Sequence, residues 1–149
     1  MTLEKLEQLE QVDEIWIRNL MDCSSSVPKD LLYLELGLIP IRYIIQTRRV
    51  LFLHHILQQK KDSLLYRFFI AQLENPTYRD WVSQVLEDLE ILEISLEIEE
   101  IQTMKIDKFK HIVKKSVKEK AFLYLLQKKT DRKSDNAKGK LIEYEDSIM

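Results

Sequence analysis

The chain has 149 residues, of which 45% are hydrophobic and 32% are charged, and its formal net charge is −2. This composition is typical of a soluble, helix-rich domain. Only two glycines and three prolines are present, which argues against a sandwich or a barrel with many tight turns. A single cysteine excludes an internal disulfide and a cysteine-based zinc site.

The hydropathy pattern lacks the signals of membrane insertion and secretion. No apolar run reaches the roughly 18 residues of a membrane span, and the N-terminus MTLEKLEQLE has no signal-peptide core. We therefore expect an intracellular protein, nuclear or cytoplasmic, with no membrane partner.

An amphipathic, acidic helix is expected from Thr2 to Met21, where apolar residues recur at helical spacing among glutamates. A core helix with a solvated acidic face and a dedicated partner surface both fit this pattern. The repeat covers too few heptads to predict a coiled coil.

The most apolar stretch of the chain runs from Pro28 to Gln59. Gly37 is placed to end a short helix at Leu36, and Pro40 to begin a long one that nothing interrupts before Gln59. The long helix is apolar nearly all round, so we expect it to be central and buried. One predicted face carries Ile41, Ile44, Ile45, Phe52 and Ile56, and the other carries Val50, Leu53 and Leu57.

Three arginines lie on this long helix. Arg48 projects into the face of Ile44 and Phe52, where an unpaired guanidinium would be costly. It should therefore have a partner, either an internal carboxylate such as that of Glu35 or a nucleic-acid phosphate. Arg42 and Arg49, seven residues apart, share a second face that we expect to be open to solvent or to a ligand.

Further helices are expected along the rest of the chain. Asp62 or Ser63 should begin a helix that ends near Glu74, and Thr77 with Asp80 forms a capping-box variant before the next. A short helix capped by Ser95 and a long one over 106–129 complete an all-α domain of six or seven helices over residues 1–129. Residues 130–149, basic and then acidic, should form a flexible tail. The predicted core comprises Ile44, Ile45, Leu51, Phe52, Leu65, Phe69, Trp81, Val85, Leu89, Phe109 and Val113.

Positive charge is concentrated near the C-terminus, where residues 102–140 contain 13 basic and 4 acidic residues. On the last long helix a basic side opposes the apolar side of Phe109 and Val113. Such a stripe fits contacts to phosphates, but it also fits an ordinary solvated face. The candidate nucleic-acid-binding residues are Arg42, Arg48, Arg49, Lys108, Lys114, Lys115 and Lys118.

Catalytic signatures are missing from the sequence. His54, His55 and His111 show neither metal-ligand spacing nor the arrangement of a nucleophilic triad, and no glycine-rich phosphate loop occurs. We therefore expect no enzyme activity, no cofactor, no metal and no small-molecule substrate.

A family resemblance is carried by LLYLELGLIPIRYIIQTRRVLFLHHIL, FFIAQLENPTYRDWVSQVLEDLE, FKHIVKKSVKEKAFLYLL and KGKLIEYEDSIM. In this order they resemble the helical region that follows the catalytic palm in non-LTR (LINE-type) retrotransposon reverse transcriptases. The matching positions are Gly37 and Pro40, the arginines Arg42, Arg48 and Arg49, and Asn75-Pro76.

The resemblance implies a thumb-like or linker segment that cradles RNA or a template-primer duplex. The sequence departs from the family in lacking the Tyr/Phe-x-Asp-Asp motif of the palm, the cysteine-histidine knuckle and the nuclease carboxylates. With these departures, the resemblance implies a non-catalytic fragment of the polyprotein. The alternative is a helical protein-interaction or structural module that binds no nucleic acid.

Overall fold

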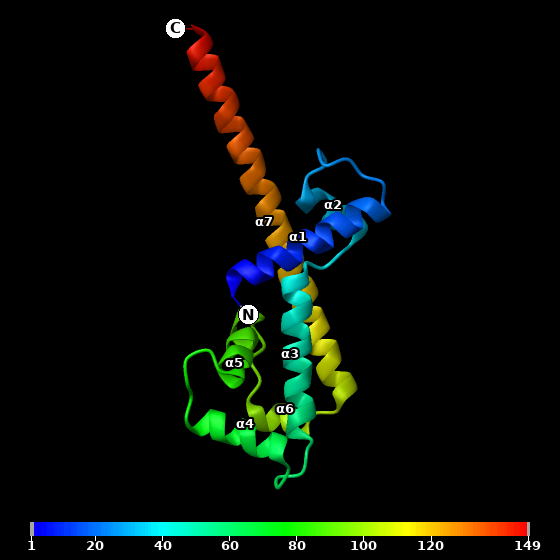
Figure 1. Cartoon of the computed structure of the whole chain (residues 1–149), viewed down its shortest axis with the longest axis vertical. Coiled ribbons are helices and arrows are strands. Elements are labelled where there is room, and N and C mark those ends of the chain that lie inside the picture. Colours follow the sequence, from blue (N-terminus) through cyan, green and yellow to red (C-terminus); the bar gives the residue numbers. More distant parts are fainter. Residues whose placement is uncertain (1, 149) are drawn as a thin grey trace. The chain divides into compact units, whose positions relative to one another are not determined.

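The computed structural model describes the backbone of residues 2–148 and the side chains of residues 2–136. Within these limits the fold is all-α, as predicted, with seven helices and no strand (Figure 1). The helices are α1 (Leu3–Leu20), α2 (Lys29–Leu36), α3 (Ile41–Leu57), α4 (Leu64–Glu74), α5 (Trp81–Ile91), α6 (Ile98–Thr103) and α7 (Ile106–Ile148). Most of the expected tail, residues 130–149, lies outside the described side chains.

The chain divides into two compact units. The first contains Met1–Pro40 and Ala121–Met149, and the second contains Ile41–Lys120, so α7 contributes to both. No helix in the described part of the chain is long and apolar enough to cross a membrane. Each unit has its own set of buried side chains.

The first unit is built around Tyr33, which is 1% exposed. Its ring belongs to a small core with Ile17 of α1, Leu32 of α2 and Leu125 of α7. The hydroxyl of Tyr33 donates a hydrogen bond to Asp13 (2.7 Å), and burial together with this carboxylate raises the pKa of the phenol. Gly37 ends α2 with φ +65°, the left-handed conformation that was expected there.

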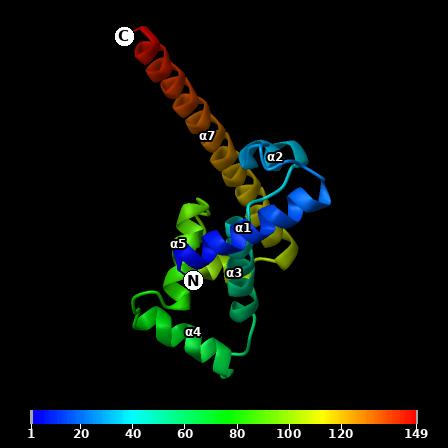
Figure 2. The same ribbon diagram turned by 45° about the horizontal axis from the view of Figure 1, so that its top comes forward.

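The second unit is organised around α3, which packs against α4, α5 and α6. Figures 1 and 2 show α4 and α5 together on one side of α3. His54, 5% exposed, connects α3 to α7, because its ring stacks on Phe109 (centroids 5.5 Å apart) and its Nε2 lies 2.7 Å from the carbonyl oxygen of Met104. A central helix was therefore predicted correctly.

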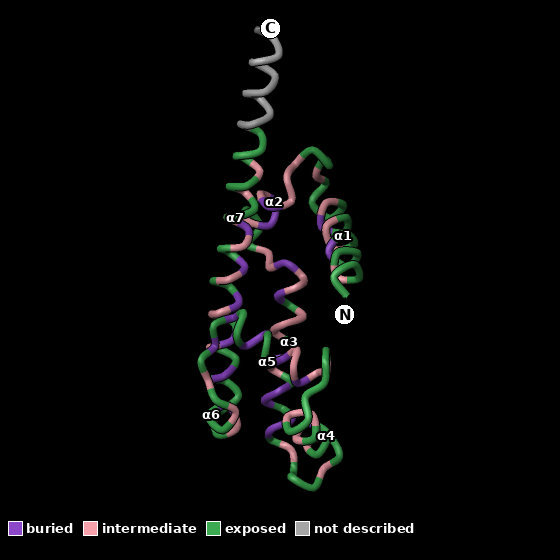
Figure 3. The backbone as a smooth tube through the Cα atoms, turned by 90° about the vertical axis from the view of Figure 1, so that its left-hand side faces the viewer, coloured by how far each residue is buried: buried purple, intermediate pink, exposed green. Residues whose placement is uncertain are grey.

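The prediction that Ile44 and Phe52 of α3 belong to the core was wrong. Ile44 is 40% exposed and Phe52 is 43% exposed, whereas Val50 and Leu53 are 0% exposed. Figure 3 shows this alternation of buried and exposed residues along the helices. Because α3 is apolar nearly all round, its sequence did not identify the buried side.

The rest of the predicted core is mixed. The following residues are buried as expected: Phe69, Val85, Leu89, Phe109 and Val113. Leu65 is 37% exposed, which contradicts the prediction, and Ile45, Leu51 and Trp81 are only half-buried. The Phe52 ring meets Trp81 edge-on at 5.8 Å, so these two aromatics contact each other at the surface of the unit rather than inside it.

Two expected helix starts shift along the chain. Asp80 itself is the N-cap of α5, since its Oδ1 accepts a hydrogen bond from the Ser83 N–H (2.7 Å) and its Oδ2 accepts one from the Thr77 N–H (2.8 Å). Ser95 does not cap α6, which begins after Glu97 without a side-chain cap. The Thr77–Asp80 pair is thus present, but the N-cap is Asp80, three residues after Thr77.

The cap makes α5 sensitive to acid. Hydrogen bonds from Thr77 and Ser83 lower the pKa of Asp80 from 3.8 to about 2, so the native state binds this proton less tightly than the unfolded chain. The stability from this group is fully present above pH 4 and is lost as pH falls towards 2. We expect Asp80→Asn, which still caps but does not titrate, to reduce the loss of stability between about pH 4 and pH 2.

Urea unfolding of both proteins, followed by circular dichroism at several pH values, measures this difference. If the stability difference between wild type and Asp80→Asn is the same at pH 6 and pH 2.5, the carboxylate does not contribute in its charged form.

Candidate nucleic-acid interface

The first part of α7 has one buried side and one cationic side. Phe109 and Val113 are 0% exposed and Val117 is 2% exposed, and their spacing of four residues places them along one side of the helix. Lysines follow the opposite side of the same turns, because they fall between these apolar positions. The buried side therefore determines which way the lysines point.

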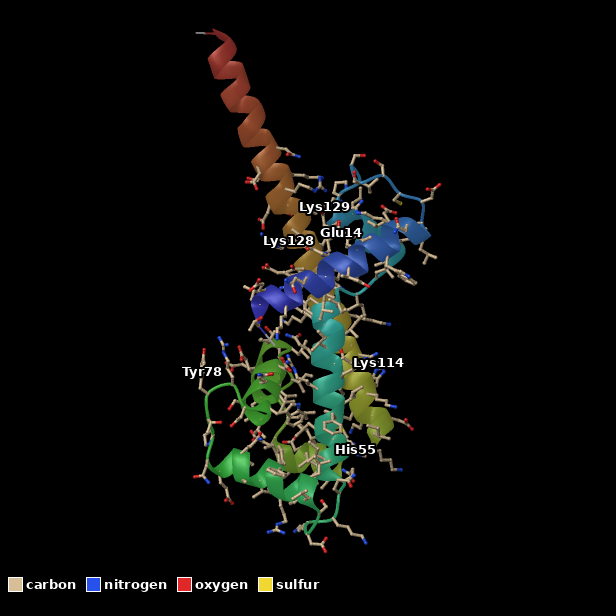
Figure 4. The ribbon with its side chains drawn as sticks, viewed as in Figure 1. Glu14, His55, Tyr78, Lys114, Lys128 and Lys129 are labelled. Carbon is tan, nitrogen blue, oxygen red and sulfur yellow. The ribbon has the colours of Figure 1, made fainter. Side chains whose placement is uncertain are left out.

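The cationic side is a row of four residues, Lys108, His111, Lys115 and Lys118, all exposed. Their spacing of three, four and three residues keeps them on one line along the helix, over about 15 Å at 1.5 Å per residue. Lys114 is also exposed, lies beside this row and points away from α3 in Figure 4. We call these four residues together with Lys114 the lysine row.

The row carries few compensating acids. Between positions 105 and 118 the sequence has six lysines and one acidic residue, Asp107. Among the described residues, the four lysines of the row form no ion pair with a carboxylate. Lys120, by contrast, pairs with Glu93 at 2.8 Å. The row is therefore an accessible line of positive charge on the surface of the second unit.

The structure corrects the prediction for Arg49. Its guanidinium forms two hydrogen bonds with Asp88, from Nε to Oδ2 (2.7 Å) and from Nη2 to Oδ1 (3.0 Å), and Nη1 donates to Gln84 (3.1 Å). Asp88 is 3% exposed, and its burial raises the pKa of the carboxyl against the opposing effect of Arg49. Arg49 thus joins α3 to α5, and three of its five N–H donors are used within the second unit.

The expected burial of Arg48 was wrong. This side chain is exposed, so it does not require an internal partner such as Glu35, and a phosphate partner stays a prediction. It lies on the same exposed side of α3 as Phe52, whereas α7 contacts α3 through the buried His54. The structure therefore does not bring Arg48 to the lysine row.

Arg42 is half-buried and has an interaction of its own within the structure, so it is not a free cation. Of the seven candidates, only the four lysines are thus brought together on one accessible surface. Two lysines that were not among the candidates, Lys105 and Lys110, are also exposed on the same segment. They were not chosen as candidates because Lys110 lies to one side of the row and Lys105 precedes the helix.

Among the residues that the structure describes, no group of three His, Cys, Asp or Glu side chains could hold a metal ion. A hollow of about 510 Å³ beside the loop between α4 and α5 is lined by residues such as Tyr78, Arg79 and Glu87. Tyr78 is 87% exposed in this loop (Figure 4), and the Arg79 guanidinium lies over its ring at 4.9 Å.

Comparisons with protein-family models, with curated proteins and with solved structures find no match to this chain.

Proposed function

We propose that this chain is a non-catalytic helical module that binds RNA or a template-primer duplex through its phosphates, and that it derives from the region after the palm of a non-LTR reverse transcriptase. The lysine row on α7 is the observation that supports this function. Its charges lie opposite the core and are not neutralised by neighbouring carboxylates in the described structure. The resemblance supports the ancestry.

The spacing of the row suits a polyanion. Successive residues along it are about 5 Å apart at 1.5 Å per residue. Such a line can follow consecutive phosphates of a strand, whereas it has no fixed donors or acceptors that would distinguish bases. Binding should therefore be strong at low salt, weaken as salt rises, and show little sequence preference.

The test removes three charges from the row. Lys114→Gln/Lys115→Gln/Lys118→Gln should weaken binding to all sequences alike and should flatten the dependence of log K on log salt by up to about three units. Glutamine is nearly as good a helix former as lysine, so α7 should remain intact. Fluorescence anisotropy with a labelled RNA hairpin and a labelled DNA duplex, over a salt series, measures both effects.

A matched control removes three exposed lysines elsewhere, Lys5, Lys60 and Lys61, and changes the net charge equally. If the wild type binds neither nucleic acid at low salt, the proposal fails. It fails also if the control variant flattens the salt dependence as much as the variant of the row, because the effect would then reflect net charge alone.

A helical protein-interaction module is the second candidate. The observation that favours it is the number of exposed apolar side chains on α1, among them Val12, Trp16 and Leu20 at 63–67% exposure. Association through such apolar faces should change little with salt, whereas phosphate binding should weaken steeply. The same salt series therefore separates the two functions.

A further inference from the structure

A histidine takes one place in the lysine row. His111 lies between Lys108, three residues before it, and Lys115, four residues after it, and all three side chains are exposed. At 3.6 residues per turn, these positions lie within about 60° of one another around α7. The imidazole therefore faces the same solvent as the lysine ammonium groups, at a point where an unbroken row of lysines would have another charge.

The charge of this histidine, unlike that of the lysines, changes near neutral pH. Lysine is positive throughout the physiological range, whereas a free imidazole is about 90% charged at pH 5.5 and about 10% charged at pH 7.5. The row thus combines one charge that depends on pH with the fixed charges of Lys108, Lys114, Lys115 and Lys118.

The imidazole of His111 has no partner within the described part of the chain. It forms no hydrogen bond, ion pair or ring contact with another described residue. His54, by contrast, is 5% exposed, stacks on Phe109 and has its Nε2 2.7 Å from the carbonyl oxygen of Met104. The ring nitrogens of His111 are therefore available to a ligand.

The charged residues nearest to His111 in sequence belong to α7 itself. Those within one turn of it are Lys108, Lys114, Lys115 and Asp107. Asp107 is the single acidic residue between positions 105 and 118. The exposed acids of α6, Glu99 and Glu100, form no ion pair with the row among the described residues. The surroundings of His111 are therefore mainly cationic.

Charged and titratable groups of the other neighbouring elements face different sides of α7. His54 of α3 contacts Phe109, and Glu93, which follows α5, pairs with Lys120 at 2.8 Å. Positions 109 and 120 lie about 160° and about 180° around the helix from His111. Neither group therefore competes with a ligand for this imidazole.

A bound phosphate would change the charge around His111. Its negative charge favours the protonated imidazole, which can donate a hydrogen bond from each ring nitrogen. Charge-assisted hydrogen bonds of this kind are stronger than neutral ones. Because linkage is reciprocal, a ligand that favours the protonated form also binds more tightly when the proton is already present.

We propose that His111 makes phosphate binding at the lysine row dependent on pH, so that the row binds a phosphate chain more tightly in mildly acidic than in neutral conditions. This inference rests on the proposed function, because it states how binding at the same row is regulated. At pH 7.5 the lysines supply the positive charge alone, and at pH 5.5 the protonated imidazole adds one more cation to the line.

The test compares binding of the full chain to a labelled RNA hairpin at pH 5.5 and pH 7.5, by fluorescence anisotropy in low salt. The hairpin should lack a terminal phosphate, because a phosphate monoester titrates near pH 6. The dissociation constant of the wild type should be about fivefold to tenfold lower at pH 5.5, and the dependence of log K on log salt should be steeper there by up to about one unit. Circular dichroism checks that the chain is folded at both pH values.

Two substitutions of His111 should act in opposite ways. His111→Gln cannot become charged, so it should bind about fivefold or more weakly than the wild type at pH 5.5. His111→Lys has a fixed charge, so at pH 7.5 it should bind about as tightly as the wild type does at pH 5.5. Both replacements are good helix formers at an exposed position, so α7 should remain intact.

His55→Gln is the matched control. His55 is also exposed, but it lies on α3 outside the lysine row, with its ring stacked on Phe52 at 5.5 Å. This variant should keep the pH dependence of the wild type.

The inference is overturned if the wild type binds equally well at both pH values, if His111→Gln keeps the pH dependence, or if His55→Gln loses it. In each of these cases the proposed function stands as long as Lys114→Gln/Lys115→Gln/Lys118→Gln flattens the salt dependence. A wild type that binds the hairpin at neither pH overturns the inference and the proposed function together.

Discussion

Replacing Arg49 by methionine should lower the free energy of unfolding by about 3 kcal/mol, because it leaves the Asp88 carboxylate buried without its partner. The pair is close, at 2.7 Å, and the Asp88 side chain is 4% exposed. We expect the lower end of the usual range for such pairs, since the Arg49 side chain is 25% exposed and its own desolvation is incomplete. Urea unfolding followed by circular dichroism gives the value.

Two further variants separate the charge from the packing. Arg49→Lys keeps a cation but loses the paired geometry with Asp88, so it should cost less than Arg49→Met. The double variant Arg49→Met/Asp88→Leu removes both charges and should recover most of the lost stability. An unfolding midpoint of Arg49→Met equal to that of the wild type would show that Asp88 does not need its partner.

Replacing Leu53 by alanine should cost about 2–5 kcal/mol, which is enough to unfold a marginally stable domain. Leu53 is 0% exposed on the buried side of α3, so its removal leaves a cavity that the neighbouring helices cannot fill completely. A thermal melt measures the change.

Phe52→Ala is the matched comparison on the same helix. From the sequence alone we expected Phe52 to be a core residue, and its truncation to cost about 3–5 kcal/mol. Because its side chain is 43% exposed and contacts Trp81 at the surface, we now expect only about 1–2 kcal/mol. If Phe52→Ala destabilises more than Leu53→Ala, the assignment of the buried side of α3 is wrong.

The two kinds of helix in this chain show what the sequence alone could predict. In the first part of α7, apolar residues occur only at Phe109, Val113 and Val117 and nearby positions, with lysines between them. Only one orientation of the helix buries these apolar residues and exposes the lysines. The sequence therefore predicted the buried side of the helix, and it predicted that Lys108, Lys114, Lys115 and Lys118 are exposed.

The orientation of α3 and the roles of its arginines depended on the tertiary structure. Apolar residues surround this helix, so its periodicity did not distinguish Ile44 and Phe52 from Val50 and Leu53. Arg49 and Asp88 are 39 positions apart, and no local sequence pattern predicts an ion pair at that separation. The spacing of apolar residues along the chain is enough to predict that a segment is helical. Which side of a uniformly apolar helix is buried depends instead on the neighbouring helices that pack against it.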